Sequence, residues 1–109
     1  MANWQPVASL SELPEGEIHP VSAEGADLIV VRSGGNVAVY RDSCPHEGHP
    51  LSQGYLEDEV IVCAKHLWEF DACTGRHISR VHRPEHDLKK PGSRIVDGRL
   101  EVDLDSFLK

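Results

Sequence analysis

The sequence predicts an all-β domain, a small antiparallel sandwich or barrel, and three observations lead to this fold class. Short runs of β-branched and other apolar residues recur along the chain, and Gly, Pro, Asn and Asp lie between them. Hardly any segment shows the apolar periodicity of a helix. At 109 residues the chain has room for a single domain, residues 1–109, with one modest core.

The first predicted hairpin pairs Leu28–Val31 with Val37–Tyr40. Both runs are rich in β-branched residues, and Ser33–Asn36 between them contains two glycines and an asparagine. Glycine and asparagine tolerate the positive φ that tight hairpin turns require. We therefore expect the two runs to form neighbouring antiparallel strands.

The second predicted hairpin lies near the C-terminus, where Asp97 and Gly98 separate Arg94–Val96 from Arg99–Leu104. Asp-Gly between two such runs is a strong hairpin signal. The second run alternates apolar and charged residues, which predicts a strand with one face on the core and one in water. The residues expected on the core face are Leu100, Val102 and Leu104.

Two further elements are expected between the N-terminus and the middle of the chain. Leu51–Leu56 and Glu59–Cys63 form a third candidate strand pair. Leu10–Glu17 allows at most one helical turn, with Ser11 as its N-cap, because Pro14 and Gly16 interrupt it.

Charge and composition exclude several classes of function. Eleven Lys and Arg against eighteen Asp and Glu give a formal charge of −7, which argues against nucleic acid as a partner. The longest apolar stretches, such as Val60–Ala64, are far shorter than the about 20 residues of a membrane span. No signal peptide is visible at the N-terminus, and three cysteines do not suggest a disulfide framework. We expect a cytoplasmic protein.

Two segments carry the chemistry, Cys44-Pro45-His46 and Cys63-Ala64-Lys65-His66, and sixteen residues separate them. Soft thiolates select zinc, copper(I) or iron–sulfur centres, and imidazole suits zinc and iron. Zinc modules usually place like ligands together, whereas each segment here supplies one cysteine and one histidine. The spacing therefore favours a Rieske [2Fe-2S] cluster over a structural zinc module. Cys44 and Cys63 would hold one iron, and His46 and His66 the other.

With these two segments, the sequence resembles the Rieske-type ferredoxins, and the resemblance covers nearly the whole chain. The C-P-H-x-G of Cys44–Gly48 and the C-x-x-H of Cys63–His66, followed by the turn of Phe70–Gly75, are similar to the two cluster loops of that family. The resemblance implies that Cys44, His46, Cys63 and His66 are the cluster ligands. It also implies that the two loops lie at one tip of the β domain, with both histidines near solvent.

The resemblance also indicates a subgroup. Rieske proteins of respiratory chains carry an additional cysteine in each loop, and His49 and Lys65 stand at those positions, so no disulfide can cover the cluster. Trp68 stands where those proteins place a serine that donates a hydrogen bond to sulfide. With fewer such bonds, we expect a potential near the lower end of the range of about −150 to +300 mV.

The sequence His66-Leu67-Trp68 is similar to the ferredoxin components of soluble diiron monooxygenases that oxidise toluene, phenols or alkenes. The resemblance thus implies a one-electron carrier, not an enzyme, in aromatic hydrocarbon catabolism. It would pass electrons from an NADH-dependent flavin reductase to a diiron hydroxylase. Docking would be transient, at the tip with His46 and His66 and with Trp68 as a further contact, and the carrier would be a monomer. The alternative is the ferredoxin of a ring-hydroxylating dioxygenase system.

Cys73 is predicted to be a partly buried thiol that does not bind the cluster. Trp68 is expected to pack at the base of its loop, and its alternative role is the contact with a docking partner. Gly48, Gly54 and Gly75 are expected to allow tight turns and to let backbone N–H groups approach the cluster. Pro84 is expected in a segment that covers the cluster. The remaining histidines are predicted to lie at the surface: His19, His49, His77, His82 and His86.

Overall fold

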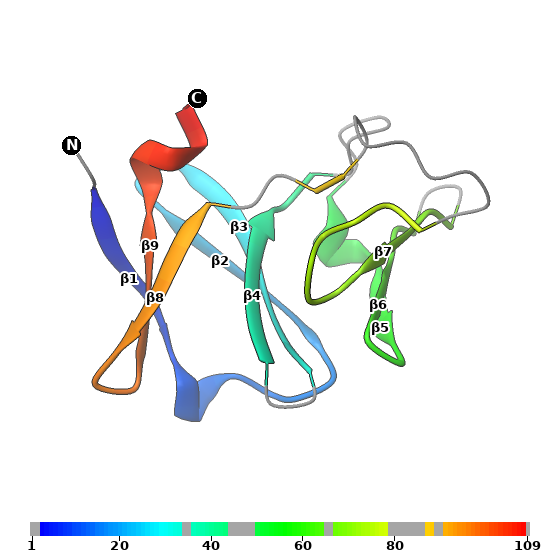
Figure 1. Ribbon diagram of the computed structural model, residues 1–109, viewed down its shortest axis with the longest axis horizontal. Helices are drawn as coiled ribbons and strands as arrows, with labels where there is room; N and C mark the ends of the chain where they lie inside the picture. Colours follow the sequence, from blue (N-terminus) through cyan, green and yellow to red (C-terminus); the bar gives the residue numbers. More distant parts are fainter. Residues whose placement is uncertain are drawn as a thin grey trace.

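The computed structural model consists of three small antiparallel sheets (Figure 1). It describes residues 3–33, 36–43, 50–64, 67–78, 87–88 and 91–108. Within these ranges, the helical segments are short 3-10 turns. The prediction of an all-β antiparallel fold is confirmed.

The strands follow one another along the chain with few intervening residues in the first half. They are β1 (Trp4–Ser9), β2 (Ile18–Ala23), β3 (Ala26–Ser33), β4 (Asn36–Arg41), β5 (Tyr55–Glu57), β6 (Val60–Val62), β7 (Glu69–Asp71), β8 (Gly92–Val96) and β9 (Arg99–Asp103). The 3-10 turns are η1 (Leu10–Glu12), η2 (Leu51–Gln53) and η4 (Leu104–Leu108).

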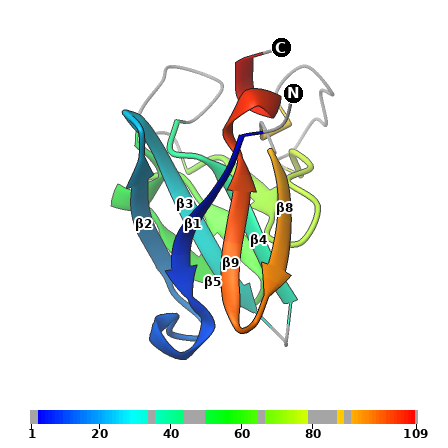
Figure 2. The same ribbon diagram turned by 90° about the vertical axis from the view of Figure 1, so that its left-hand side faces the viewer.

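The three sheets are arranged as layers with the β2-β3-β4 sheet in the middle. One outer sheet has the strand order β1-β9-β8 and the other β5-β6-β7. Figure 1 shows the first at the left and the second at the right of β4. Turned by 90°, the molecule shows β1, β9 and β8 in front of the middle sheet (Figure 2).

Strand β3 contains an uninterrupted apolar run, Leu28–Val31, because both of its faces are covered by other parts of the protein. Leu28 and Val30 belong to the core shared with the β1-β9-β8 sheet, whereas Ile29 and Val31 belong to the core shared with β5-β6-β7. Side chains alternate between the two faces of a strand, so both faces of β3 are buried. Burial of each side chain contributes about 1.5–3 kcal/mol.

Both strongly predicted hairpins are present. Strands β3 and β4 pair antiparallel, with Leu28 opposite Arg41 and Ser33 opposite Asn36. Strands β8 and β9 pair through the Asp97-Gly98 turn, where both residues have positive φ. Leu100, Val102 and Leu104 are buried as predicted, although Leu104 begins η4 and is not part of the strand.

Two of the weaker predictions were wrong in detail. Leu51–Gln53 forms η2, so only Tyr55 and Leu56 of the predicted strand lie in β5, which pairs with β6. The N-cap residue of η1 is Ser9, so the turn begins at Leu10 and the predicted cap, Ser11, lies inside it. Each is a single turn stabilised by a local backbone hydrogen bond, which apolar periodicity does not detect.

The sequence did not predict β1, β2 or β7. Pro6 lies in β1 and Pro20 in β2, and a proline normally argues against a strand because it lacks the amide hydrogen. Both strands are at the edge of their sheets, where a missing donor is tolerated. In β1, Pro6 also adjoins a register shift against β9. Strand β7 has only three residues, too few for a periodic signal.

Candidate metal centre

Cys63 is the predicted ligand that the structure describes. It follows β6 directly, and its side chain is fully buried. Its backbone amide donates a hydrogen bond to the Trp68 carbonyl at 2.8 Å, which closes the segment between the two residues into a loop. The other predicted ligands, Cys44, His46 and His66, lie outside the described residues, so their approach to Cys63 stays a prediction.

The ends of the first ligand segment are joined by side-chain hydrogen bonds. Asp42, just after β4, accepts a bond from the backbone amide of Ser52 at 2.8 Å and another from the Ser52 hydroxyl at 2.7 Å. The chain between them contains Cys44 and His46. Sequence reasoning missed this pair, because residues ten positions apart share no local motif.

Gly54 lies against the backbone that leads into Cys63. A Cβ atom at Gly54 would overlap the carbonyl oxygen of Val62 and would lie 3.3 Å from the amide nitrogen of Ala64. The φ of Gly54 is −88°, so close approach of two backbones, not a positive φ, requires glycine here. The predicted approach of backbone N–H groups to the cluster stays a prediction, and the close approach that the structure describes at Gly54 is to the backbone of Val62 and Ala64.

The segment from Phe70 to Gly75 forms a tight turn behind the Cys63 loop. One carboxylate oxygen of Asp71 accepts the amides of Cys73 at 2.8 Å and Thr74 at 3.0 Å. Gly75 has a φ of +77° and donates its amide to the Asp71 carbonyl at 2.8 Å. These bonds explain the spacing of Asp, Thr and Gly in this motif.

Tyr40 connects this turn to the middle sheet. Its hydroxyl donates a hydrogen bond to the Ala72 carbonyl at 2.8 Å, and the ring is fully buried. A Cβ at Gly75 would lie 2.7 Å from a ring carbon of Tyr40. Burial raises the pKa of the Tyr40 phenol far above its usual value, and nearby Cys73 and Asp71 raise it further. The phenol therefore stays protonated and remains a hydrogen-bond donor.

Trp68 and His77 pack together under the Cys63 loop. The rings of Trp68 and His77 are 4.6 Å apart, and the rings of Phe70 and His77 are 5.4 Å apart. The prediction that Trp68 packs at the base of the loop is confirmed, since it contacts the core around Phe70. The prediction of a surface position for His77 was wrong, because this side chain is 3% exposed. A β-bridge to Phe70 draws His77 inward.

The other predicted residues show mixed outcomes. Cys73 is half-buried as predicted, and its sulfur lies 3.7 Å from the side-chain amide nitrogen of Asn36. His19 lies half-buried in β2. The remaining residues lie outside the described parts of the chain: Gly48, His49, Lys65, His82, Pro84 and His86.

The donor chemistry that the structure describes fits an iron–sulfur cluster. A buried thiol at the end of a strand, in a loop closed by a backbone bond, provides a soft ligand shielded from water. In the described ranges no three of the His, Cys, Asp and Glu side chains gather at one point. Three of the four predicted ligands lie beyond those ranges.

The described residues define a small antiparallel β protein with a buried thiol, Cys63, where strand β6 meets a loop. The model of the Rieske [2Fe-2S] domain family matches residues 3–91. The chain belongs to this family, which confirms the resemblance found in the sequence and identifies the cofactor as a [2Fe-2S] cluster.

Similar proteins are ferredoxins of oxygenase systems. The ferredoxin component of the naphthalene 1,2-dioxygenase system of Pseudomonas aeruginosa is 36% identical over 101 residues, covering 93% of this chain and 95% of that protein. The ferredoxin component of the alkene monooxygenase system of Xanthobacter autotrophicus is 30% identical over 95 residues, covering 84% of this chain and 78% of that protein.

A solved structure supports the same assignment. The complex of reduced oxygenase and oxidized ferredoxin in carbazole 1,9a-dioxygenase contains a chain that is 31% identical, with a TM-score of 0.78 and 92% of each chain covered. The protein is thus a Rieske-type ferredoxin, an electron-transfer protein and not a catalytic subunit. Among the described residues, no helix is long and apolar enough to cross a membrane.

Proposed function

We propose that this ferredoxin carries single electrons from an NADH-dependent flavin reductase to the oxygenase of a multicomponent system in the cytoplasm. The observation that supports this function best is the nearly full-length similarity to ferredoxin components of such systems. The match covers 95% of the naphthalene dioxygenase ferredoxin and 78% of the alkene monooxygenase ferredoxin, and the proposed unit is the single domain of residues 1–109.

The comparisons favour a ring-hydroxylating dioxygenase as the electron acceptor. The naphthalene dioxygenase ferredoxin is more similar to this chain than the alkene monooxygenase ferredoxin, at 36% against 30% identity. The dioxygenase alternative of the sequence analysis is therefore the better supported. A diiron monooxygenase remains the second candidate, because the Leu67-Trp68 pair after His66 is similar to the ferredoxins of such enzymes.

We propose Cys44, Cys63, His46 and His66 as the cluster ligands, with the two thiolates on one iron and the two imidazoles on the other. When bound, the cluster accepts and releases one electron. The surrounding chain shields the thiolate side, because Cys63 is buried beneath the loop that Trp68 closes. The imidazole side would be the route for electrons to and from partners.

Leu67 is the described residue best placed to contact a partner beside the ligands. Its side chain is 63% exposed, and its φ of +53° is unusual for leucine. Trp68, by contrast, is half-buried against the core and supports the loop from beneath. Exposed apolar side chains beside a redox centre suit a small, transient interface.

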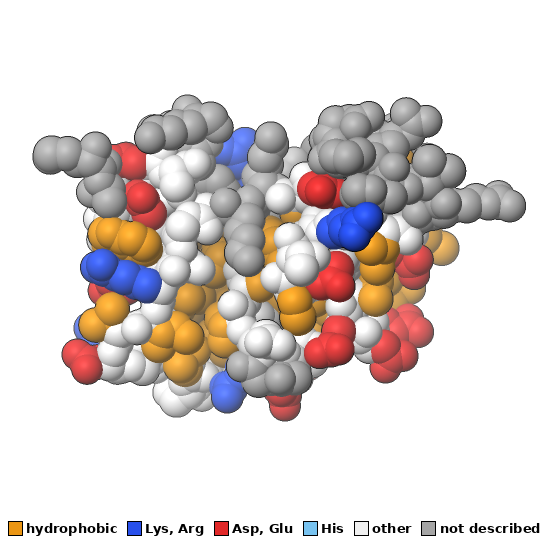
Figure 3. All heavy atoms as spheres, viewed as in Figure 1, with side chains coloured by type: hydrophobic (Ala, Val, Ile, Leu, Met, Phe, Trp, Pro, Cys, Tyr) orange, Lys and Arg blue, Asp and Glu red, His pale blue; other side chains and the backbone are white. Residues whose placement is uncertain are grey.

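Acidic side chains surround the end of the molecule formed by β5, β6 and β7, at the right of Figure 3. Exposed members of this group are Glu57, Asp58, Glu59 and Glu69. Because like signs repel and opposite signs attract over about 8–10 Å at moderate salt, this end suits partners with basic docking surfaces.

The cofactor assignment is tested by analysing the purified protein before and after reduction with dithionite. We expect about two irons and two sulfides per chain and an EPR signal only after reduction. Cys44→Ser, Cys63→Ser, His46→Ala and His66→Ala should each lose the cluster, whereas Cys73→Ser should keep it as a control. A colourless protein with one zinc would contradict the proposal.

The partner is tested by reconstitution with a flavin reductase, NADH and each oxygenase separately. Naphthalene 1,2-dioxygenase and alkene monooxygenase serve as the two acceptors, and substrate oxidation per NADH is measured. We expect faster turnover with the dioxygenase. Faster turnover with the monooxygenase would support the second candidate, and no turnover with either would contradict an oxygenase partner of these types.

A further inference from the structure

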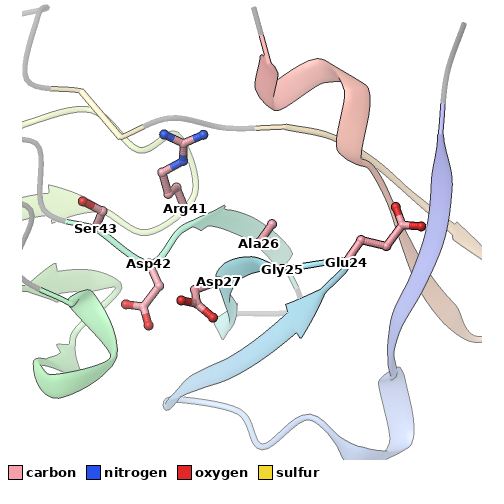
Figure 4. A pocket seen from close by; sticks show the side chains of 7 residues that line it. All are labelled: Glu24, Gly25, Ala26, Asp27, Arg41, Asp42 and Ser43. Atoms are coloured by element: carbon pink, nitrogen blue, oxygen red, sulfur yellow. The ribbon is translucent and has the colours of Figure 1, made fainter.

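The two hydrogen bonds between Asp42 and Ser52 span the first ligand segment. Asp42 follows the end of β4 and Ser52 lies in η2, and both residues are half-buried. Each oxygen of the Asp42 carboxylate has its own donor, the Ser52 amide at 2.8 Å and the Ser52 hydroxyl at 2.7 Å. In Figure 4 the Asp42 side chain points away from Ser43 and toward η2.

Both ends of this connection are held by contacts with the rest of the fold. The backbone amide of Asp42 donates to the Asp27 carbonyl at 3.0 Å, which ties it to β3. On the other side, Leu51 of η2 is fully buried next to Ser52. The bonds therefore hold the two ends of the ligand segment at a fixed separation on the middle sheet.

The structure also shows what the carboxylate at position 42 does for turn η2. Turn η2 has Pro50 at its N-cap, a residue without a side-chain cap for the first amides of the turn. Asp42 supplies that cap from ten residues earlier in the chain and accepts the Ser52 hydroxyl as well. Each carboxylate oxygen of Asp42 accepts one of these bonds, whereas an asparagine at this position would have one acceptor oxygen and one donor group.

We propose that Asp42 is a positioning residue for the [2Fe-2S] cluster, which acts by fixing the ends of the segment that carries Cys44 and His46. This inference rests on the proposed ligand set. Closing the segment in advance removes part of the entropy that cluster binding would otherwise cost. Loss of the clamp should therefore weaken retention of the cluster and disturb its surroundings more than it weakens the fold.

The test compares Asp42→Ala with Asp103→Ala in the cluster-loaded protein. Asp103 is a matched control, because its carboxylate also accepts two amides, those of Asn3 at 2.9 Å and Asp105 at 3.1 Å, at the end of β9. We expect Asp42→Ala to lose the cluster about ten times faster than wild type under chelator, equivalent to about 1.4 kcal/mol. Asp103→Ala should lose the cluster at a rate within about two-fold of wild type. The comparison is made under conditions in which the two alanine variants have equal thermal stability.

Three further readouts separate positioning from general stability. The EPR g-values and the reduction potential should shift in Asp42→Ala and not in Asp103→Ala. Ser52→Ala keeps the hydrogen bond from its backbone amide to Asp42, so it should speed cluster loss less than Asp42→Ala does. The double variant should lose the cluster at nearly the same rate as Asp42→Ala alone. Asp42→Asn should restore part of the retention, since its carbonyl oxygen can still accept the Ser52 amide.

Equal cluster loss and equal spectra in the two alanine variants would overturn the inference. The Ser52 amide should exchange its hydrogen faster in Asp42→Ala, a readout that does not require the cluster, and unchanged exchange would also overturn it. A wild-type protein without iron and sulfide would instead contradict the proposed function. The two failures are therefore distinguishable.

Discussion

Tyr40 shows how one buried side chain connects the middle sheet to the segment behind the candidate cluster loop. Its hydroxyl donates to the Ala72 carbonyl, and its ring contacts Gly75 so closely that no side chain fits there. An alanine at Gly75 would also be strained by the positive φ. Tyr40 and Gly75 therefore depend on each other, although 34 positions of sequence separate them.

The raised pKa of Tyr40 predicts a loss of stability at high pH. Because burial, Cys73 and Asp71 keep the phenol protonated in the folded protein, only the unfolded chain releases this proton near pH 10. Above that pH the unfolded state is favoured by about 1.4 kcal/mol per pH unit from this group. We expect urea midpoints of wild type to fall more steeply above pH 10 than those of Tyr40→Phe.

The same variant should be less stable near neutral pH, because it loses the bond to the Ala72 carbonyl. The expected cost is about 1–2 kcal/mol. Tyr55→Phe is the control, since the Tyr55 side chain is about half exposed, and its pH profile should match wild type. Parallel profiles for wild type and Tyr40→Phe would contradict the assignment of the pH dependence to Tyr40.

Gly54→Ala should disturb the backbone that carries Cys63. The added methyl would overlap the Val62 carbonyl oxygen, so β6 or η2 must shift. We expect a destabilisation of about 2–4 kcal/mol, with a visible spectrum that differs from wild type. Gly98→Ala is the control, because that glycine has a positive φ but open space around it. Its cost should be limited to about 1 kcal/mol, with an unchanged spectrum.

At the scale of elements, the turn of the β5-β6 hairpin has a backbone conformation that its residues, Asp58 and Glu59, rarely adopt. Asp58 and Glu59 have φ values of +47° and +65°, and this left-handed geometry at both central positions favours Asn-Gly. The backbone is strained at Glu59 in particular, since glutamate rarely adopts positive φ. The hairpin forms because Ile61 packs in the core and Leu56 packs against it.

Replacing Asp58 and Glu59 by Asn and Gly should therefore stabilise the protein. We expect a gain of about 0.5–1.5 kcal/mol in the free energy of unfolding, measured by urea denaturation. Glu17→Gly is the matched control, because the backbone of this exposed residue has no positive φ and the same change should lower stability. A loss of stability in the Asn-Gly variant would show that the turn geometry differs.

For the whole molecule, we predict a reduction potential near the lower end of the Rieske range of about −150 to +300 mV. By the resemblance to Rieske proteins of respiratory chains, Trp68 stands where those proteins have a serine that donates to sulfide, and hydrogen bonds to the sulfurs raise the potential. The measurement is a redox titration followed by EPR. A value above about +100 mV would contradict the subgroup inferred from the loop residues.

Much of the fold could be predicted where the signal is local. The β3-β4 and β8-β9 hairpins have turn residues between two apolar runs, and both are present. The edge strands β1 and β2 could not be predicted, because each contains a proline that only their edge positions allow. Likewise, no local sequence signal predicts the burial of His77, because that burial results from its β-bridge to Phe70.

The sequence by itself determined the all-β class and, through the spacing of its cysteines and histidines, the kind of cofactor. Both depend on short-range chemistry, namely the alternation of side chains along a strand and the ligand preferences of iron. The tertiary structure alone decided that β3 divides its side chains between two cores and that Asp42 bonds to Ser52. Such contacts join residues distant along the chain, and they form only when the packed sheets bring those residues together.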